Sequence, residues 1–239
     1  MNPQNLAVRI HEVQLRLARA ALAAGRSAHS VTLLAVGKAQ PAELLAAAAD
    51  RGLRHFGESY LQEALEKMAA LEQRRLTWHF VGRIQANKTR PIAEHFAWVH
   101  AVDRLRIAER LAAQRPPNTA PLNVCLQVNV AGEAGKGGVS PAELAPLARA
   151  VAQLPRLALR GLMCIPPEEH EPTRQRLWFA RLRTLEAELN AAGLALDTLS
   201  MGMSADFEAA IAEGATIVRL GTVLFGPRPS DTSDTIDVP

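Results

Sequence analysis

The feature that most constrains the fold is a repeated alternation of short apolar segments and helix-like segments between residues 31 and 226. The apolar segments are rich in aliphatic and β-branched residues, which is typical of buried strands. The expected strands begin near Val31, Leu53, Thr77, Trp98, Leu122, Leu157, Ala195 and Thr216. Nearly continuous apolar strands that each precede a helix predict an α/β fold with parallel strands covered by helices.

The count of eight strand-then-helix units predicts a single (β/α)8 TIM barrel. An extra amphipathic N-terminal helix is expected over residues 6–24, ended by Gly25. We assign residues 1–229 to this barrel domain, and we expect residues 230–239 to be disordered because they have almost nothing to bury. An open, doubly wound sheet is the alternative, since one short strand could be misassigned.

Composition narrows the functional class. Lys+Arg 27 against Asp+Glu 24 gives a net charge of +3, and the arginines are scattered through helical segments without interleaved aromatics, so nucleic-acid binding is not expected. Cys125 and Cys164 lie in apolar runs and predict buried thiols in a reducing compartment. The sequence shows neither a signal peptide nor an apolar stretch long enough to span a membrane. We therefore expect a soluble cytoplasmic protein without membrane contact.

No metal site and no catalytic residue are predicted. The seven histidines show no ligand spacing with cysteine or carboxylate. His55 and His79 are expected to be hydrogen-bonded structural residues of the core or the rim, and not catalysts. No Ser/His/Asp set stands out.

Lys38 is the first candidate functional residue. It follows an apolar run and a glycine in VTLLAVGKAQP, without an acidic residue nearby in the sequence. An amine that emerges from an apolar strand loses hydration, which lowers its pKa and makes it a nucleophile toward carbonyl groups. The alternative is a lysine that simply reaches water. Lys67, in the polar pattern of a helix, and Lys88 and Lys136, in loops, look ordinary.

A candidate anion site lies near the other end of the chain. In (β/α)8 barrels the working face is at the carboxyl ends of the strands, and loops after the last two strands often hold a phosphate. Here those loops contain Ser200, Met201, Gly202, Met203 and Ser204, followed by Gly221 and Thr222. Glycine permits close backbone approach, and a helix N-terminus favours an anion. The alternative is that the glycines only form turns and Ser204 only caps a helix.

Arg219 lies within an otherwise apolar predicted strand, TIVRL. A buried charge is unfavourable unless it is paired or bound to a ligand. The alternative to a ligand is an ion pair with Glu58 or Asp206. A phosphate cradle opposite a desolvated lysine, with an arginine between them, suits pyridoxal 5'-phosphate (PLP). An arginine facing the ring nitrogen would leave that nitrogen unprotonated, and the ring would then be a poor electron sink.

Seven motifs resemble the pyridoxal phosphate homeostasis proteins, which are single-domain relatives of the alanine racemase barrel. They are AVGKAQP (35–41), FGESYLQE (56–63), HFVGRIQANK (79–88), QVNVAGEAGKGG (127–138), RGLMCIP (160–166), LSMGMSADFEAAIAEGAT (199–216) and VRLGTVLFG (218–226). They cover nearly the whole chain in the family's order.

The resemblance implies that Lys38 carries PLP as a Schiff base. The residues from Ser200 to Ser204, with Gly221 and Thr222, would hold the phosphate, and Arg219 would face the ring nitrogen. It also implies intracellular PLP (vitamin B6) homeostasis and amino-acid balance, without established turnover. Apo PLP-dependent enzymes would be the recipients, and we expect a monomer, with a dimer as the alternative.

Two positions depart from the family pattern. Ser59 replaces the usual asparagine after the second strand, where it is expected to cap a helix in a capping box with Gln62 and to contact the ligand. Gly37 replaces the usual serine before Lys38.

Two enzymatic alternatives remain open. A racemase needs an acid/base group on each face of the α-carbon. Alanine racemases supply a tyrosine from a second domain, whereas the only tyrosine here is Tyr60, next to the helix after the second strand, so the site is expected to lack one base. A Schiff-base aldolase would use Lys38 on a sugar phosphate without PLP.

Overall fold

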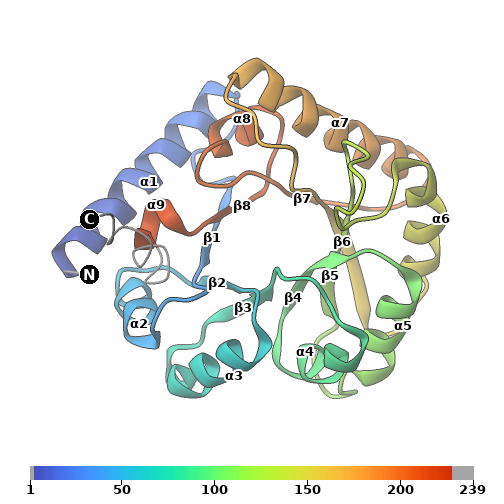
Figure 1. Cartoon of the computed structure of the whole chain (residues 1–239), viewed down its shortest axis with the longest axis horizontal. Helices are drawn as coiled ribbons and strands as arrows, with labels where there is room; N and C mark the ends of the chain where they lie inside the picture. The colour runs from blue at the N-terminus through green and yellow to red at the C-terminus, as the bar shows by residue number, and fades with distance from the viewer. Residues whose placement is uncertain (1–2, 228–239) are drawn as a thin grey trace, which may run out of the picture.

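The computed structural model describes residues 3–227, which form a closed barrel with its strands in sequence order (Figure 1). The strands are β1 (Thr32–Val36), β2 (His55–Glu58), β3 (Thr77–Phe80), β4 (Trp98–Val102), β5 (Leu122–Gln127), β6 (Leu157–Met163), β7 (Thr198–Ser200) and β8 (Ile217–Leu220). Every neighbouring pair is parallel, and β1 closes the ring against β8. The predicted (β/α)8 TIM barrel is confirmed, and the open sheet is excluded.

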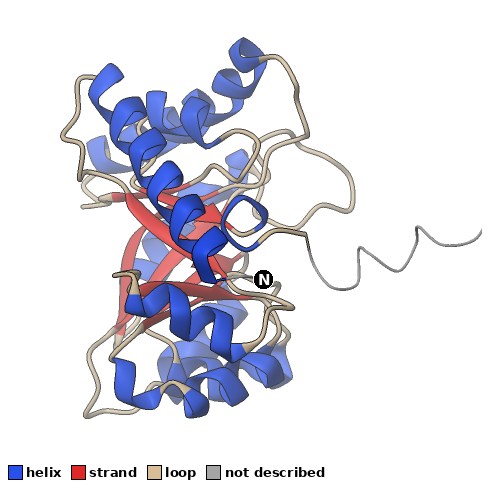
Figure 2. Ribbon diagram, turned by 90° about the vertical axis from the view of Figure 1, so that its left-hand side faces the viewer, coloured by secondary structure: helices blue, strands red, loops and turns tan. Residues whose placement is uncertain are grey.

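Helices surround the ring of strands on all sides in Figure 1, and Figure 2 shows them flanking the barrel. They are α1 (Pro3–Ala23), α2 (Ala42–Asp50), α3 (Leu61–Ala70), α4 (Thr89–His95), α5 (Leu105–Gln114), α6 (Pro141–Ala152), α7 (Pro172–Ala191), α8 (Phe207–Ala212) and α9 (Thr222–Phe225), with short 3-10 helices η1 (Glu72–Arg74) and η2 (Ala86–Lys88). None of these helices is both long and apolar enough to cross a membrane.

Helix α1 is the extra N-terminal element. Its buried side chains recur every three or four residues, so they form a single apolar face. They are Leu6, Ile10, Val13, Leu17 and Ala21. This face packs against α2, α8 and α9, and Gly25 follows the helix with a positive φ of 70°, which favours glycine. The predicted N-terminal helix is confirmed.

The interior of the barrel contains polar side chains as well as apolar ones. His79 of β3 and His100 of β4 are fully buried, as is Ser200 of β7. In Figure 1, β3 and β4 lie across the ring from β7 and β8. A hydrogen bond of 2.7 Å between His100 Nδ1 and Ser200 Oγ therefore spans the interior.

The eighth strand expected within residues 216–226 is β8, which ends at Leu220 before Thr222 begins α9. The predicted capping box is wrong: α3 starts at Leu61 with Tyr60 as its N-cap, and Gln62 bonds Glu66 instead. The expected tail, residues 230–239, and the domain boundary at residue 229 lie outside the described residues.

Candidate functional site

A cavity of about 290 Å³ opens at the carboxyl ends of the strands. This volume is at the lower end of the range of small-ligand pockets, roughly 300–1,000 Å³. Its lining residues follow β1, β2, β3, β6, β7 and β8: Val36, Lys38, Gln40, Ser59, Val81, Ile165, Met203, Ser204, Ala205, Arg219, Gly221, Thr222 and Gly226. Because β1 pairs with β8, residues from both ends of the sequence share one cavity.

The structure brings seven of the ten predicted site residues to this cavity. They are Lys38, Ser59, Met203, Ser204, Arg219, Gly221 and Thr222. The other three, Ser200, Met201 and Gly202, lie in the layer beneath it, where all three are buried. The carbonyl of Gly202 accepts a hydrogen bond from the backbone N–H of Arg219 at 2.9 Å. These three residues therefore support the cavity wall and do not line it.

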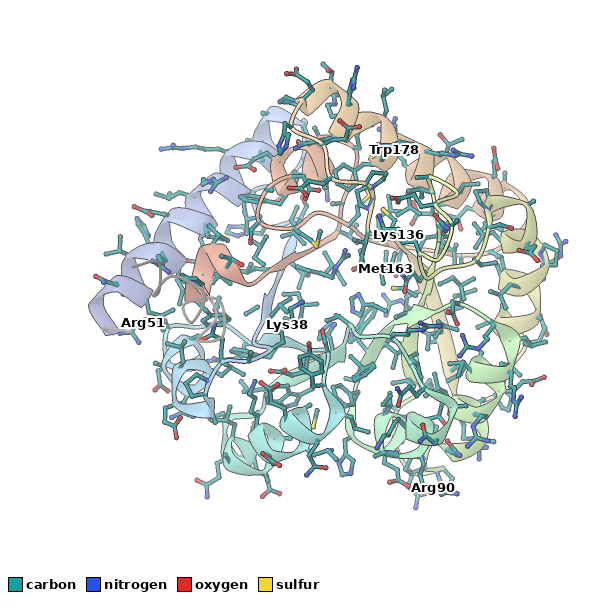
Figure 3. All side chains as sticks on the ribbon, in the orientation of Figure 1. Lys38, Arg51, Arg90, Lys136, Met163 and Trp178 are labelled. Atoms are coloured by element: carbon teal, nitrogen blue, oxygen red, sulfur yellow. The ribbon has the colours of Figure 1, made fainter. Side chains whose placement is uncertain are left out.

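Lys38 sits in a tight turn directly after β1. Figure 3 shows it on the inner side of the ring of strands. The turn is closed by a hydrogen bond from the Gln40 N–H to the Gly37 carbonyl, at 3.0 Å, and Ala39 has a positive φ of 59°. A non-glycine residue adopts this conformation only where its surroundings impose it. The Ala39 N–H is held by Glu63 Oε1 at 2.7 Å.

Lys67, which looked ordinary in the sequence, is a buried anchor of this turn. Its side chain is 5% exposed. Its Nζ donates to the Gly37 carbonyl at 2.7 Å, to Glu58 Oε1 at 2.9 Å and to Glu63 Oε1. Sequence reasoning missed this role, although the spacing of Glu63 and Lys67 places them on one helix face.

Glu58 is the buried acid of this cluster. Burial raises the pKa of its carboxyl to about 7, against the opposing effect of Lys67. Its Oε2 atom is buried without a hydrogen-bond partner among the described residues. Glu58 is therefore engaged with Lys67 and does not pair with Arg219.

The candidate anion cradle lies where the loop after β7 meets the start of α9. Ser204 Oγ accepts a hydrogen bond from the Val223 N–H at 3.4 Å, which ties the loop after β7 to α9. Ser204 does not cap α8, because Asp206 is the N-cap there. Within residues 3–227, the backbone N–H groups of Ser204, Ala205 and Thr222 have no acceptor. N–H groups of this kind favour a negatively charged ligand.

Arg219 is 6% exposed and lies at the floor of the cavity. It donates from one terminal nitrogen to the Ser200 carbonyl at 2.6 Å and to Ser200 Oγ at 2.9 Å, and from the other to the Cys164 carbonyl at 2.8 Å. No carboxylate of the described chain forms an ion pair with it, so the expected alternative with Glu58 or Asp206 is absent there. Guanidinium has five N–H donors, so two are left for a ligand.

Tyr60 does not contribute to the cavity. Its side chain is 59% exposed, and it is not among the lining residues. Cys125 and Cys164 are buried free thiols, as expected, and burial raises the pKa of each to about 12.

These features define a class: a single (β/α)8 barrel whose carboxyl-end cavity combines a lysine, a buried arginine and an anion cradle. Residues 15–229 match the family model of the alanine racemase N-terminal domain. The chain is 60% identical over 223 residues to the pyridoxal phosphate homeostasis protein of Pseudomonas aeruginosa PAO1. The match covers 93% of this chain and 96% of that one. The chain belongs to the pyridoxal phosphate homeostasis protein family.

Two further relatives agree with this assignment. The pyridoxal phosphate homeostasis protein of Escherichia coli K12 is 48% identical over 227 residues, covering 94% of this chain and 97% of that one. PipY of Synechococcus elongatus PCC7942, solved with PLP bound, is 38% identical and superposes with a TM-score of 0.81, over 92% of this chain and all of that one. The relatives are named as homeostasis proteins and not as enzymes.

Proposed function

We propose that this protein binds PLP as a Schiff base on Lys38 and serves intracellular PLP homeostasis without catalytic turnover. The observation that carries the proposal is the shared cavity, in which Lys38, Arg219 and the N–H groups at the start of α9 surround one volume. A solved relative with PLP bound supports it. When bound, PLP would supply an electrophilic aldehyde and a phosphate.

The residues of the cavity fit the two charged and reactive ends of PLP. The phosphate would lie against the N–H groups of Ser204, Ala205 and Thr222, which have no acceptor within the described chain. The half-buried Lys38 would provide the amine for the aldehyde. One of the two remaining donors of Arg219 would face the ring nitrogen. A buried guanidinium without a carboxylate partner is the feature that most needs a ligand.

The same residues favour binding of PLP without catalytic turnover. A guanidinium does not give up its proton readily, so Arg219 would donate a hydrogen bond and leave the ring nitrogen unprotonated. The ring would then withdraw electrons poorly. Among residues 3–227, no second acid/base group of the kind that racemisation requires lines the cavity, since Tyr60 is exposed and is not a lining residue.

A racemase-like activity is the second candidate, and the family model that the barrel matches is the observation that favours it. A PLP-independent Schiff-base aldolase is the third. We further propose that the protein is a cytoplasmic monomer that passes PLP to apo PLP-dependent enzymes. Two free, buried thiols suit a reducing compartment.

Absorbance of the purified protein with added PLP tests the proposal. We expect a visible imine band that is abolished by borohydride. Peptide mapping after reduction should then place the modification on Lys38. Lys38→Ala should lose the band, whereas Lys88→Ala, at an exposed lysine, should keep it. Modification at another lysine, or no band, would refute the binding mode.

Racemisation of alanine and of other amino acids by the PLP-loaded protein separates the candidates. We expect no rate above that of Lys38→Ala. Steady turnover that depends on Lys38 would overturn the storage proposal. Cleavage of a sugar phosphate by PLP-free protein would favour the aldolase.

A further inference from the structure

Three histidines form a hydrogen-bonded chain through the barrel to Arg219. His55 Nδ1 lies 3.0 Å from His79 Nε2, and His79 Nδ1 lies 2.9 Å from His100 Nε2. His100 Nδ1 lies 2.7 Å from Ser200 Oγ, which also accepts from Arg219 at 2.9 Å. The chain runs from the first residue of β2, which is half-buried, through the fully buried interior to β8. The function proposed above uses none of these histidines.

Arg219 sets the direction of this chain. Guanidinium can only donate, so Ser200 Oγ must accept from it. Within the described part of the chain, His100 Nδ1 is the one acceptor in reach of the Ser200 hydroxyl proton. A buried hydroxyl without an acceptor is strongly unfavourable, so the Ser200 O–H must donate to His100.

The direction then passes from ring to ring. Since His100 Nδ1 accepts, a neutral His100 carries its proton on Nε2 and donates it to His79 Nδ1. The same logic makes His79 donate from Nε2 to His55 Nδ1. All three imidazoles are therefore neutral Nε2–H tautomers.

The surroundings of the two inner rings favour the neutral state. The charged or titratable groups that act on them are Arg219 from β8 and His55 from β2. Arg160 from β6 lies over the Trp98 ring and not over either histidine. Trp98 itself stacks on His79 with the planes 8° apart. Burial, aided by Arg219, lowers the pKa of His100 to about 3, and burial with the two neighbouring histidines lowers the pKa of His79 well below its usual value. The direction should therefore not reverse at neutral pH.

We propose that His100 and His79 are positioning residues for Arg219. By accepting the Ser200 proton, His100 keeps the Ser200 lone pairs turned toward the guanidinium, and His79 keeps His100 in the tautomer that can accept. Arg219 is thereby held by three protein acceptors, and it lines the cavity with two N–H donors still available to a ligand. The expected effect on PLP affinity rests on the function proposed above. The assignment of the histidine tautomers is independent of that function.

Imidazole 15N–1H correlation spectra of the PLP-free protein test the direction. We expect His79 and His100 to be neutral Nε2–H tautomers from pH 5.5 to pH 8, and Ser200→Ala to lose this single tautomer. An Nδ1–H tautomer at either ring, or protonation of either ring within that pH range, would overturn the proposal.

PLP affinity tests the consequence. His100→Leu leaves the Ser200 hydroxyl without an acceptor, and we expect PLP to bind about tenfold more weakly. His100→Asn places a carbonyl oxygen near the former Nδ1 atom and should restore most of that loss. His95→Leu, at an exposed histidine of α4, is the control.

Equal losses in the Leu and Asn variants, with both folded by circular dichroism, would reduce His100 to a packing residue and overturn the positioning role. If the wild-type protein did not bind PLP, the proposed function would be refuted. The tautomer spectra would still decide the direction of the hydrogen bonds between the histidines.

Discussion

Lys67 reaches from α3 to the carboxyl end of β1, where its Nζ donates to the carbonyl of Gly37 at 2.7 Å. The turn that presents one lysine to the cavity is thus held by another lysine. Glu63 completes the arrangement, because it binds both Lys67 and the Ala39 N–H. The position of Lys38 therefore depends on a buried ion cluster in the layer outside the cavity.

Replacing Lys67 by methionine should destabilise the protein and loosen this turn. Removing one partner of a buried ion pair typically costs about 3–5 kcal/mol, because the other charge is left without compensation. We expect this loss in urea unfolding at pH 8, a pH at which Glu58 is ionised in the wild-type protein and Lys67 compensates its charge. We also expect weaker PLP binding. Lys88→Met, at an exposed lysine, is the control. Equal stability of the two variants would show that the cluster does not anchor the turn.

Glu58 should give the stability a characteristic pH dependence. Burial raises its pKa from the ordinary value of 4.5 to about 7, so the folded protein binds more protons than the unfolded chain between these values. The free energy of unfolding should therefore fall as the pH rises from about 4.5 to about 7, and level off above. Glu58→Gln should lose this component. Denaturant titrations of both proteins measure this component as a difference. Glu186, whose pKa burial also raises to about 7, is present in both proteins, so its contribution cancels. Parallel pH profiles would contradict the assignment.

Gly37 directly precedes Lys38, and a larger residue does not fit at this position. A Cβ atom at Gly37 would lie 2.8 Å from Glu58 Oε1 and 2.9 Å from Leu45 Cδ2. Overpacking of this kind costs about 1–3 kcal/mol. Gly37→Ser should show that loss in thermal or urea unfolding. Gly137→Ser, where the nearest atom would be 3.4 Å away, should change stability little. An unchanged Gly37→Ser variant would show that the cluster adapts.

Ser204 should contribute to recognition of the phosphate. Its hydroxyl ties the loop after β7 to the Val223 N–H at the start of α9. Ser204→Ala removes that bond, which is worth about 0.5–1.5 kcal/mol. We expect PLP to bind about 2–10-fold more weakly, whereas pyridoxal, which lacks the phosphate, should be affected less. Competition with inorganic phosphate provides a second measurement. Equal losses for PLP and pyridoxal would mean that the cradle lies elsewhere.

The barrel could be predicted because its signal is repeated along the chain. Each apolar strand is followed by a helix, and eight repeats leave few topologies open. The short helix α9 could not be found in the same way, because residues 223–225 are as apolar as β8 itself and hydrophobicity does not show how the backbone continues after Gly221. The helix starts at Leu61 and Phe207 were missed because a nearby serine suggested a cap that other residues occupy.

The candidate site divides along similar lines. Lys38, Arg219 and Thr222 could be singled out because each breaks an apolar pattern at a strand end, where the barrel rule applies. Lys67 could not, since its helix shows an ordinary amphipathic pattern and its burial arises from Glu58 and Gly37, which belong to other elements. The hydrogen-bonded histidines were missed for the same reason. They come from three strands, β2, β3 and β4, and meet only when these strands pair in the barrel.

Gly202 and Gly193 offer a matched pair that isolates the packing beneath the cavity. Both have a φ of +94°, so alanine would be strained equally at either position. A Cβ atom at Gly202 would lie 2.6 Å from Ala210 Cβ and 3.0 Å from Phe207 Cα, whereas at Gly193 it would meet nothing within 4 Å. Because the Gly202 carbonyl also holds the Arg219 N–H, a shift of this backbone would move the floor of the cavity.

We therefore expect Gly193→Ala to lose only the backbone contribution, about 1–2 kcal/mol, with unchanged PLP affinity. Gly202→Ala should reduce the free energy of unfolding by about 1–3 kcal/mol more than Gly193→Ala, through overpacking. It should also bind PLP more weakly. Urea unfolding and the imine absorbance measure the two effects separately. If Gly202→Ala lost stability but kept full affinity, the loop after β7 would support the fold without setting the cavity floor.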